Sequence, residues 1–144
     1  EPTSALDVSV QAQVLNLMSD LADEFGLTYL LISHDLTVVR HMADTVGVLY
    51  LGRLVEEAPP VRLNEVPLHP YTQMLLEAAP RLDAFGREAE VPKGEIPDPI
   101  SPPPGCAFHP RCPLAVDRCR RDRPELRRFG ATRVACHRAE DSLP

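Results

Sequence analysis

Long apolar segments are missing from this sequence of 144 residues. No run approaches the roughly 18 apolar residues that a membrane-spanning helix requires. The first residue is the acidic Glu1, and no basic region followed by an apolar stretch marks a secretory signal. We therefore expect neither a membrane-spanning helix nor an export signal in this chain.

Lysine is nearly absent as well, because Lys93 is the only one in the sequence. The chain consequently has no Gly-x-x-x-x-Gly-Lys-Ser/Thr loop, whose backbone N–H groups and lysine bind the phosphates of a nucleotide. An initiating methionine is also missing, which suggests a fragment or a processed product.

Proline is scarce only in the first part of the chain. Residues 1–58 contain Pro2 alone, whereas the other 15 of the 16 prolines lie from Pro59 onward. Charge divides at the same point: residues 1–58 carry nine acids and two arginines (net −7), and residues 59–144 carry twelve acids and thirteen bases (net +1). The sequence thus consists of two unlike halves.

The first half begins with the pattern of an amphipathic helix. Apolar residues recur at helical spacing from Val10 to Phe25. Asp7 or Ser9 can cap the start of this helix, and Gly26 is suited to its end.

The segments that follow predict an α/β unit. Residues 28–33 form a short apolar run of the kind found in a strand buried on both faces of a parallel sheet. His34 comes just after its carboxyl end, and a second helix is expected after Asp35. Strands are expected over residues 46–51 and again after Gly52. Because this unit offers one clear buried strand before the hairpin, it cannot cover both faces of a sheet by itself, and we expect that an upstream segment is missing.

The second half is divided by its prolines. Pro70 fits the first position of a helix that Pro80 ends, and a short polar turn precedes it. Residues 81–105 are first charged and then rich in proline, which predicts an extended linker.

The residues before the first helix, together with His34, resemble the distal half of the nucleotide-binding domain of an ATP-binding-cassette (ABC) ATPase. Three elements follow in order: Glu1, the loop from Ser4 to Asp7, and Ser33-His34-Asp35. The resemblance covers residues 1–58. It implies that Glu1 is the general base for the attacking water and that His34 contacts the γ-phosphate. It also implies that Ser4 and Asp7 bind the nucleotide and that Asp7 belongs to the loop crossing the dimer interface.

These implied roles agree with the chemistry of phosphoryl transfer. A carboxylate can accept a proton from water and an imidazole can donate to phosphate, and the enzyme's main task is to position these groups. Taken singly, each residue has a simpler explanation, such as a helix cap for Asp7. The glycine-rich signature of the family and the magnesium-binding aspartate before Glu1 are missing. We therefore expect no ATP hydrolysis by this chain alone.

Four cysteines cluster near the end of the chain in the pattern C-x5-C-x6-C-x16-C. They are Cys106, Cys112, Cys119 and Cys136. In a chain without an export signal, such a cluster favours a metal site over disulfides. The spacing contains neither the C-x2-C pairs typical of zinc sites nor the common ferredoxin spacing, so a cluster, zinc, and disulfides or free thiols all remain possible.

Arginine is concentrated in the same segment. Residues 106–138 contain nine arginines and three acids, a net charge of +6. Only Phe108 and Phe129 lie among them, too few aromatic residues for a nucleic-acid stacking surface. We expect instead that the arginines lower the thiol pKa values and balance the charge of a thiolate-bound group. The arginines in question are Arg111, Arg118, Arg120 and Arg121.

The stretch from His69-Pro70-Tyr71-Thr72 to Cys136-His137 resembles the C-terminal extension of the oligopeptide and dipeptide importer ATPases. This resemblance implies ATP and Mg²⁺ as ligands of the intact protein and a 4Fe-4S cluster on the four cysteines, with zinc as the alternative. It also implies a second ATPase subunit, two membrane-spanning permeases, an extracytoplasmic peptide-binding protein, and a peripheral position on the cytoplasmic face of the inner membrane. Nucleic acid is not expected as a partner.

The predicted fold is α/β, the C-terminal part of an ABC-type nucleotide-binding domain followed by a proline-rich linker and a small irregular Cys-rich extension. The expected segments are that domain part (1–58), a helical connection (59–80), the linker (81–105) and the extension (106–144). Two other functions are kept open: an autonomous iron–sulfur or zinc module with a redox or structural role, and an interaction domain without a site.

Overall fold

A computed structural model describes residues 7–78 and 95–142 of the chain. The chain divides into two compact units, Glu1–Asp44 and Thr45–Pro144, which are described separately. Within the described ranges, no helix has both the length and the apolar character required to cross a membrane.

The first unit begins with α1 (Val8–Phe25), the helix that the apolar spacing predicts. Asp7 caps it, because its Oδ1 accepts the backbone N–H of Val10 at 2.9 Å. Gly26 ends the helix in a left-handed conformation with φ 64°, and its N–H donates to the carbonyl of Ala22. Both predicted helix boundaries are confirmed.

The second helix, α2 (Leu36–Met42), starts after Asp35 as predicted. Oδ1 of Asp35 accepts the N–H groups of Thr37 at 2.8 Å and Val38 at 3.4 Å, so this residue is the N-cap. His34 therefore lies immediately before a capped helix.

The expected buried strand over residues 28–33 is not formed. These residues belong to no helix or strand and pair with no other described segment, and Leu30 and Ile32 are 93% and 80% exposed. A buried parallel strand requires neighbours on both sides, and the described part of this unit contains only helices beside it.

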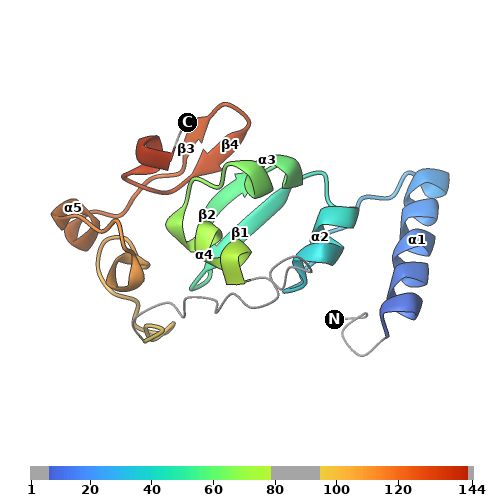
Figure 1. Cartoon of the computed structure of the whole chain (residues 1–144), viewed down its shortest axis with the longest axis horizontal. Helices are drawn as coiled ribbons and strands as arrows, with labels where there is room; N and C mark the ends of the chain where they lie inside the picture. The colour runs from blue at the N-terminus through green and yellow to red at the C-terminus, as the bar shows by residue number, and fades with distance from the viewer. Residues whose placement is uncertain (1–6, 79–94, 143–144) are drawn as a thin grey trace. The chain divides into compact units, whose positions relative to one another are not determined.

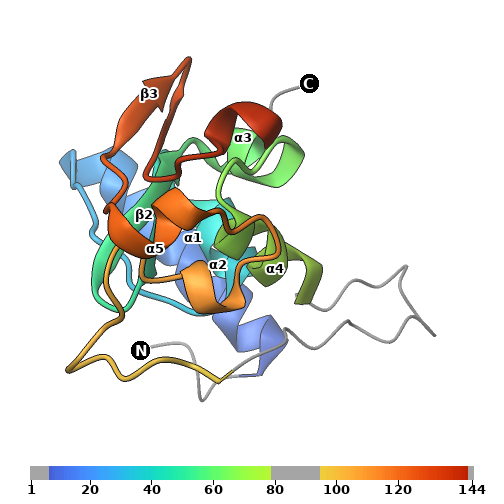
Figure 2. The same cartoon turned by 90° about the vertical axis from the view of Figure 1, so that its left-hand side faces the viewer.

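The second unit is built on one sheet of four strands in the order β1-β2-β4-β3. All three pairings are antiparallel, and the pairing of β2 with β4 joins segments that lie more than 70 residues apart in the sequence. Figures 1 and 2 show the red hairpin of β3 and β4 next to the green strand β2. The strands are β1 (Val46–Tyr50), β2 (Arg53–Ala58), β3 (Arg127–Phe129) and β4 (Thr132–Val134).

This sheet corrects one expectation about the fold. The cysteine-rich end is not an irregular extension, because two of its segments complete the sheet that begins with β1 and β2. Its short strands carry no pattern long enough to predict them. The described residues 95–105 contain neither helix nor strand, and the rest of the expected linker, residues 81–94, lies outside the described residues.

The β1–β2 hairpin is confirmed, and its turn explains the glycine within it. Leu51 and Gly52 connect the strands with φ values of 47° and 72°. Positive φ at both positions matches the right-handed twist of a two-residue hairpin, and glycine adopts it without steric cost.

Short helical segments surround the sheet. The helix expected at Pro70 begins there, whereas α3 replaces the expected polar turn. The segments are α3 (Pro60–Glu65), α4 (Pro70–Ala78), η1 (His109–Arg111), α5 (Asp117–Arg121) and η2 (Ala139–Ser142).

The core of the second unit has two parts, and cysteines belong to both. One part contains Val134 and Cys136. The other surrounds Phe108, with Cys106 and Cys112 packed against it. The cysteines are therefore integral to the packing of this unit.

Candidate metal centre

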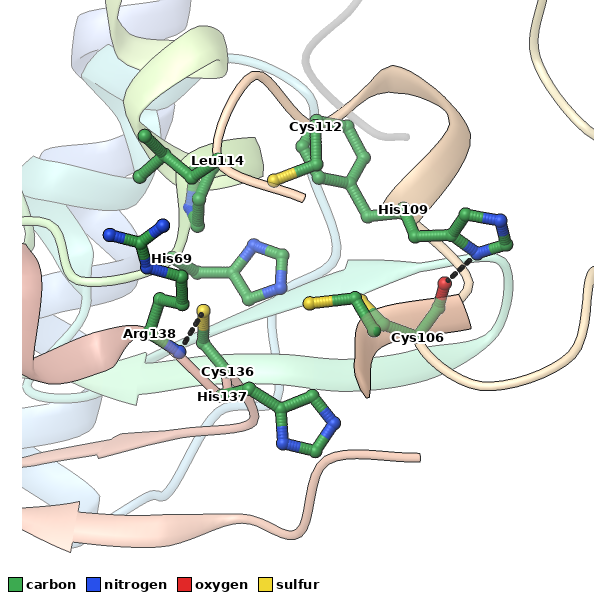
Figure 3. Close-up of a pocket in the computed structure, with 11 residues that line it drawn as sticks. His69, Cys106, His109, Cys112, Leu114, Cys136, His137 and Arg138 are labelled. Carbon is green, nitrogen blue, oxygen red and sulfur yellow. Dashed lines mark hydrogen bonds between the residues drawn. The ribbon is translucent and has the colours of Figure 1, made fainter. Parts of the chain in front are cut away.

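All four cysteines line a single pocket (Figure 3). They come from three places in the sequence: the turn around η1, the helix α5, and the residues after β4. Cys119 and Cys136 are buried, and the other two are partly buried. Three histidines, His69, His109 and His137, line the same pocket. The four cysteines that the sequence predicts as metal ligands therefore line the same pocket.

Gly105 brings two of the cysteine segments together. Its φ is 70°, and a Cβ at this position would clash with the carbonyl oxygen of Cys119. The close approach allows the N–H of Cys106 to donate to that oxygen at 2.8 Å. Only glycine combines this backbone conformation with this contact.

Strand pairing sets the position of the fourth cysteine, Cys136. Beyond β4 the N–H of Ala135 donates to the carbonyl of Val55 at 2.8 Å, which extends the pairing with β2 by one residue. Cys136 follows directly, and its Sγ accepts the N–H of Arg138 at 3.4 Å. The position of this cysteine is therefore set by the sheet.

Glu56 on β2 fixes the wall of the pocket that contains His69. Its side chain is fully buried, and its two carboxylate oxygens accept the N–H groups of Leu68 at 2.7 Å and His69 at 3.0 Å. Burial raises the pKa of the Glu56 carboxyl, and the two backbone donors partly offset that effect. Sequence reasoning missed this residue, because a glutamate in a strand next to another glutamate gives no sign of being buried.

Glu56→Gln is expected to lower the free energy of unfolding by about 2–3 kcal/mol, because hydrogen bonds to a charged group contribute about 1.5–3 kcal/mol and the amide nitrogen would face a backbone donor. Chemical denaturation of the purified chain measures this. Glu57→Gln is the matched control: Glu57 makes a partly exposed ion pair with Arg133 at 2.5 Å, worth about 0–1 kcal/mol. Equal losses in the two variants would contradict the proposed role of Glu56.

The environment of the thiols is mainly apolar. Burial raises the pKa of Cys106 and Cys112, and it raises the pKa of Cys136 to about 11. Backbone N–H groups act in the opposite direction on each of the three, and each includes the N–H two residues further along the chain, from Phe108, Leu114 and Arg138 respectively. The chain thus supplies donors to three of the sulfurs, and these donors stabilise thiolates.

The expected influence of the arginines is not found. The charge that lowers the pKa of Cys112 is that of Arg138, and burial outweighs it. Arg118, Arg120 and Arg121 have exposed side chains, and Arg118 pairs with Asp122 at 3.6 Å. Their charge is screened by solvent at these positions.

The described cysteines are all free thiols, and none forms a disulfide. Within residues 7–78 and 95–142, no three His, Cys, Asp or Glu side chains are grouped so that they could hold a metal ion.

The residues predicted for ATP chemistry are described only in part. Glu1 and Ser4 lie outside the described residues. Asp7 uses its carboxylate to cap α1, and His34 lies exposed in a bend before α2.

Several known proteins named for peptide transport are similar to this chain. Residues 55–119 match the family described as the oligopeptide/dipeptide transporter C-terminal region. The di/tripeptide transport ATP-binding protein DppF of Pseudomonas aeruginosa is 55% identical over 99% of this chain. Over nearly its whole length, the chain is therefore similar to part of the ATP-binding proteins named for peptide transport.

Two further ATP-binding proteins named for peptide transport match the chain at similar identity. The dipeptide transport ATP-binding protein DppF of Escherichia coli is 53% identical over 94% of the chain, and the oligopeptide transport ATP-binding protein AppF of Bacillus subtilis is 53% identical over 95%. The chain spans 45% of the Pseudomonas relative, 41% of the Escherichia relative and 43% of the Bacillus relative.

Proposed function

We propose that the chain acts as the C-terminal part of the ATP-hydrolysing subunit of an importer for dipeptides or oligopeptides. The observation that carries this proposal is the identity of 53–55%, over nearly the whole chain, to proteins named for dipeptide, di/tripeptide and oligopeptide transport. The phosphate-binding loop that this sequence lacks would come from the remainder of the intact subunit.

ATP and Mg²⁺ are the proposed ligands of that subunit. Glu1 would accept a proton from the attacking water, Ser4 and Asp7 would lie in the loop at the nucleotide, and His34 would donate to the γ-phosphate. The capping of α2 by Asp35 supports the role of His34, because a rigid helix start fixes the backbone next to it. ATP hydrolysis would then require both these residues and the phosphate-binding loop, which this sequence does not contain.

The proposed partners follow from the same assignment. A second ATPase subunit would face this one, and two permeases would form the membrane passage above them, supplied by an extracytoplasmic peptide-binding protein. The subunit would lie on the cytoplasmic face of the inner membrane.

His34→Ala in the assembled transporter tests this function. We expect ATP hydrolysis and labelled-peptide uptake in proteoliposomes to fall about 100-fold or more, because a donor to the γ-phosphate acts in the transition state. His41→Ala is the matched control, since His41 is an exposed histidine on α2, and it should retain both activities. Full peptide uptake by the His34 variant would contradict the proposed role of His34. A complete wild-type transporter that takes up no peptide would contradict the proposed function.

A 4Fe-4S cluster is the proposed cofactor of the pocket. Its fit rests on the donor set: four cysteines line one mainly apolar pocket, and three of the sulfurs receive backbone N–H donors. Cys106, Cys112, Cys119 and Cys136 would hold the cluster, which when bound supplies a one-electron redox centre and a cross-link between segments. We assign it a structural role, because metal binding contributes folding free energy to small segments.

A zinc ion on the same four cysteines is the alternative occupant, since four thiolates suit tetrahedral zinc. The second candidate function, an autonomous metal-binding module, is favoured by one observation: the unit Thr45–Pro144 is compact and contains all four cysteines. Such a module would retain its metal and its fold when expressed apart from any ATPase domain. A transporter subunit, in contrast, requires both the ATPase domain and this unit for activity.

A further inference from the structure

A second hollow on the unit Thr45–Pro144 is separate from the cysteines, none of which lines it. We call it the α3–η2 groove, and its lining consists of residues 65–67, Gln73, Leu114 and residues 141–142. These residues come from the end of α3, the loop that follows it, α4, the segment after η1, and η2. The volume of the groove is about 560 Å³, within the range of about 300–1,000 Å³ that is typical of small-ligand sites.

Two carboxylates of the groove are open to solvent. The side chain of Glu65 is 58% exposed, and that of Asp141 is 46% exposed. Glu65 pairs with Arg62 at 3.9 Å, and Asp141 pairs with Arg138, but neither arginine lines the groove. Exposed ion pairs contribute little free energy, so a cation in the groove can compete for these two carboxylates, which we call the rim carboxylates.

Three other lining residues are apolar and half-buried. They are Val66, Pro67 and Leu114. A small inorganic cation would leave this apolar surface in contact with water. The combination of carboxylates and apolar side chains therefore favours an organic cation that carries an apolar group.

Gln73 and Ser142 add hydrogen-bonding groups whose positions are already fixed. The amide nitrogen of Gln73 donates to the carbonyl of Pro67 at 2.9 Å and to the hydroxyl of Ser142 at 3.3 Å. The amide oxygen of Gln73 can only accept, and the hydroxyl of Ser142 still has its own proton to donate. These two residues can therefore serve one N–H and one C=O of a peptide backbone.

We propose that the α3–η2 groove binds the N-terminal end of a short peptide whose ammonium group pairs with the rim carboxylates and whose first side chain is apolar. Charge complementarity carries the proposal, because an ammonium group forms charge-assisted hydrogen bonds with carboxylates. The groove takes no part in the proposed ATP hydrolysis. The choice of a peptide among amines rests on the proposed function, because import would release peptides on the side of the membrane where the subunit lies.

Three ligands test this proposal on the purified intact subunit. Leucylglycylglycine has the required ammonium group, its N-acetyl form has lost that charge, and butylamine represents the lysine side chain of a protein partner. By isothermal titration calorimetry at low salt, we expect the free tripeptide to bind with a dissociation constant of about 1 mM or lower. The acetylated tripeptide and butylamine should each bind at least about tenfold more weakly. Failure of the free tripeptide to bind, or equal binding of either other ligand, overturns the proposal.

Variants of the rim carboxylates locate the site. Glu65→Gln combined with Asp141→Asn should weaken binding of the free tripeptide at least about tenfold, because both charges that attract the ammonium group are removed. Glu77→Gln is the matched control, since Glu77 is an exposed acid on α4 that does not line the groove, and it should bind within about twofold of wild type. Arg138→Gln breaks the same ion pair as Asp141→Asn but keeps the carboxylate, so it should bind at least as tightly as wild type. Weakening in Arg138→Gln equal to that in the double variant would overturn the role of the carboxylates.

The outcomes distinguish this inference from the proposed function. A complete transporter that takes up no peptide contradicts the proposed function, even if its subunit binds leucylglycylglycine. An active transporter whose subunit does not bind the tripeptide overturns the groove alone. If the double variant does not fold, the free and acetylated tripeptides on the wild-type subunit decide, because their comparison requires no substitution.

Discussion

Glu1→Gln in the intact ATPase subunit is expected to lower kcat for ATP hydrolysis by about 10²- to 10⁴-fold, the range typical of a lost general base. The amide has nearly the same shape as the carboxylate but cannot accept a proton from the attacking water. ATP affinity should be retained, because the substitution leaves the phosphate-binding groups unchanged. Phosphate release under single-turnover conditions and binding of a fluorescent nucleotide measure the two effects separately.

Glu24→Gln provides the matched control for this prediction. Glu24 is an exposed acid on α1, and its replacement should leave kcat within about twofold of wild type, as expected for a surface substitution. Full ATPase activity of the Glu1 variant would contradict the general-base role of Glu1. It would leave the proposed peptide transport by the subunit untouched.

Cys119→Ser is expected to remove the iron–sulfur cluster. The wild-type subunit, purified without oxygen, should contain about four irons per chain and absorb broadly near ~400 nm, whereas the variant should contain almost no iron. Cys119 is buried, and the serine variant keeps the backbone hydrogen bond from Cys106 to the carbonyl of residue 119, so the loss of iron reports on the sulfur alone. Thermal melting of the variant should begin at a lower temperature, because the cluster contributes folding free energy.

Arg120→Ser tests whether any substitution beside Cys119 has the same effect. Its side chain is exposed and lies next to the cysteine in sequence, so iron content and melting should match those of the wild type. Zinc at one ion per chain in place of iron would contradict the cluster and support the alternative site. An unchanged melt after complete removal of the metal would contradict its structural role.

The local features of this fold were predictable because their causes are local. Asp7, Gly26 and Asp35 mark helix ends through contacts within a few residues, and these were confirmed. The start of α4 at Pro70 follows from the geometry of proline itself. The strand expected over residues 28–33 was wrong, because its formation depends on neighbouring strands.

The candidate site was predictable in its ligands but not in its construction. Four clustered cysteines indicate a thiolate site by composition alone. The pairing of β2 with β4 and the burial of Glu56 depend on contacts between distant segments, and a single sequence contains no signal for them.

The sharing of cysteines between the pocket and the two parts of the core has a consequence for how the protein matures in the cell. Cys136 packs in one part, and Cys106 and Cys112 pack against the other. A cofactor inserted after these regions had closed would have to reopen both. The proposed cluster would therefore be delivered before this unit finishes its collapse, and the supply of cofactor during synthesis would limit the yield of mature protein.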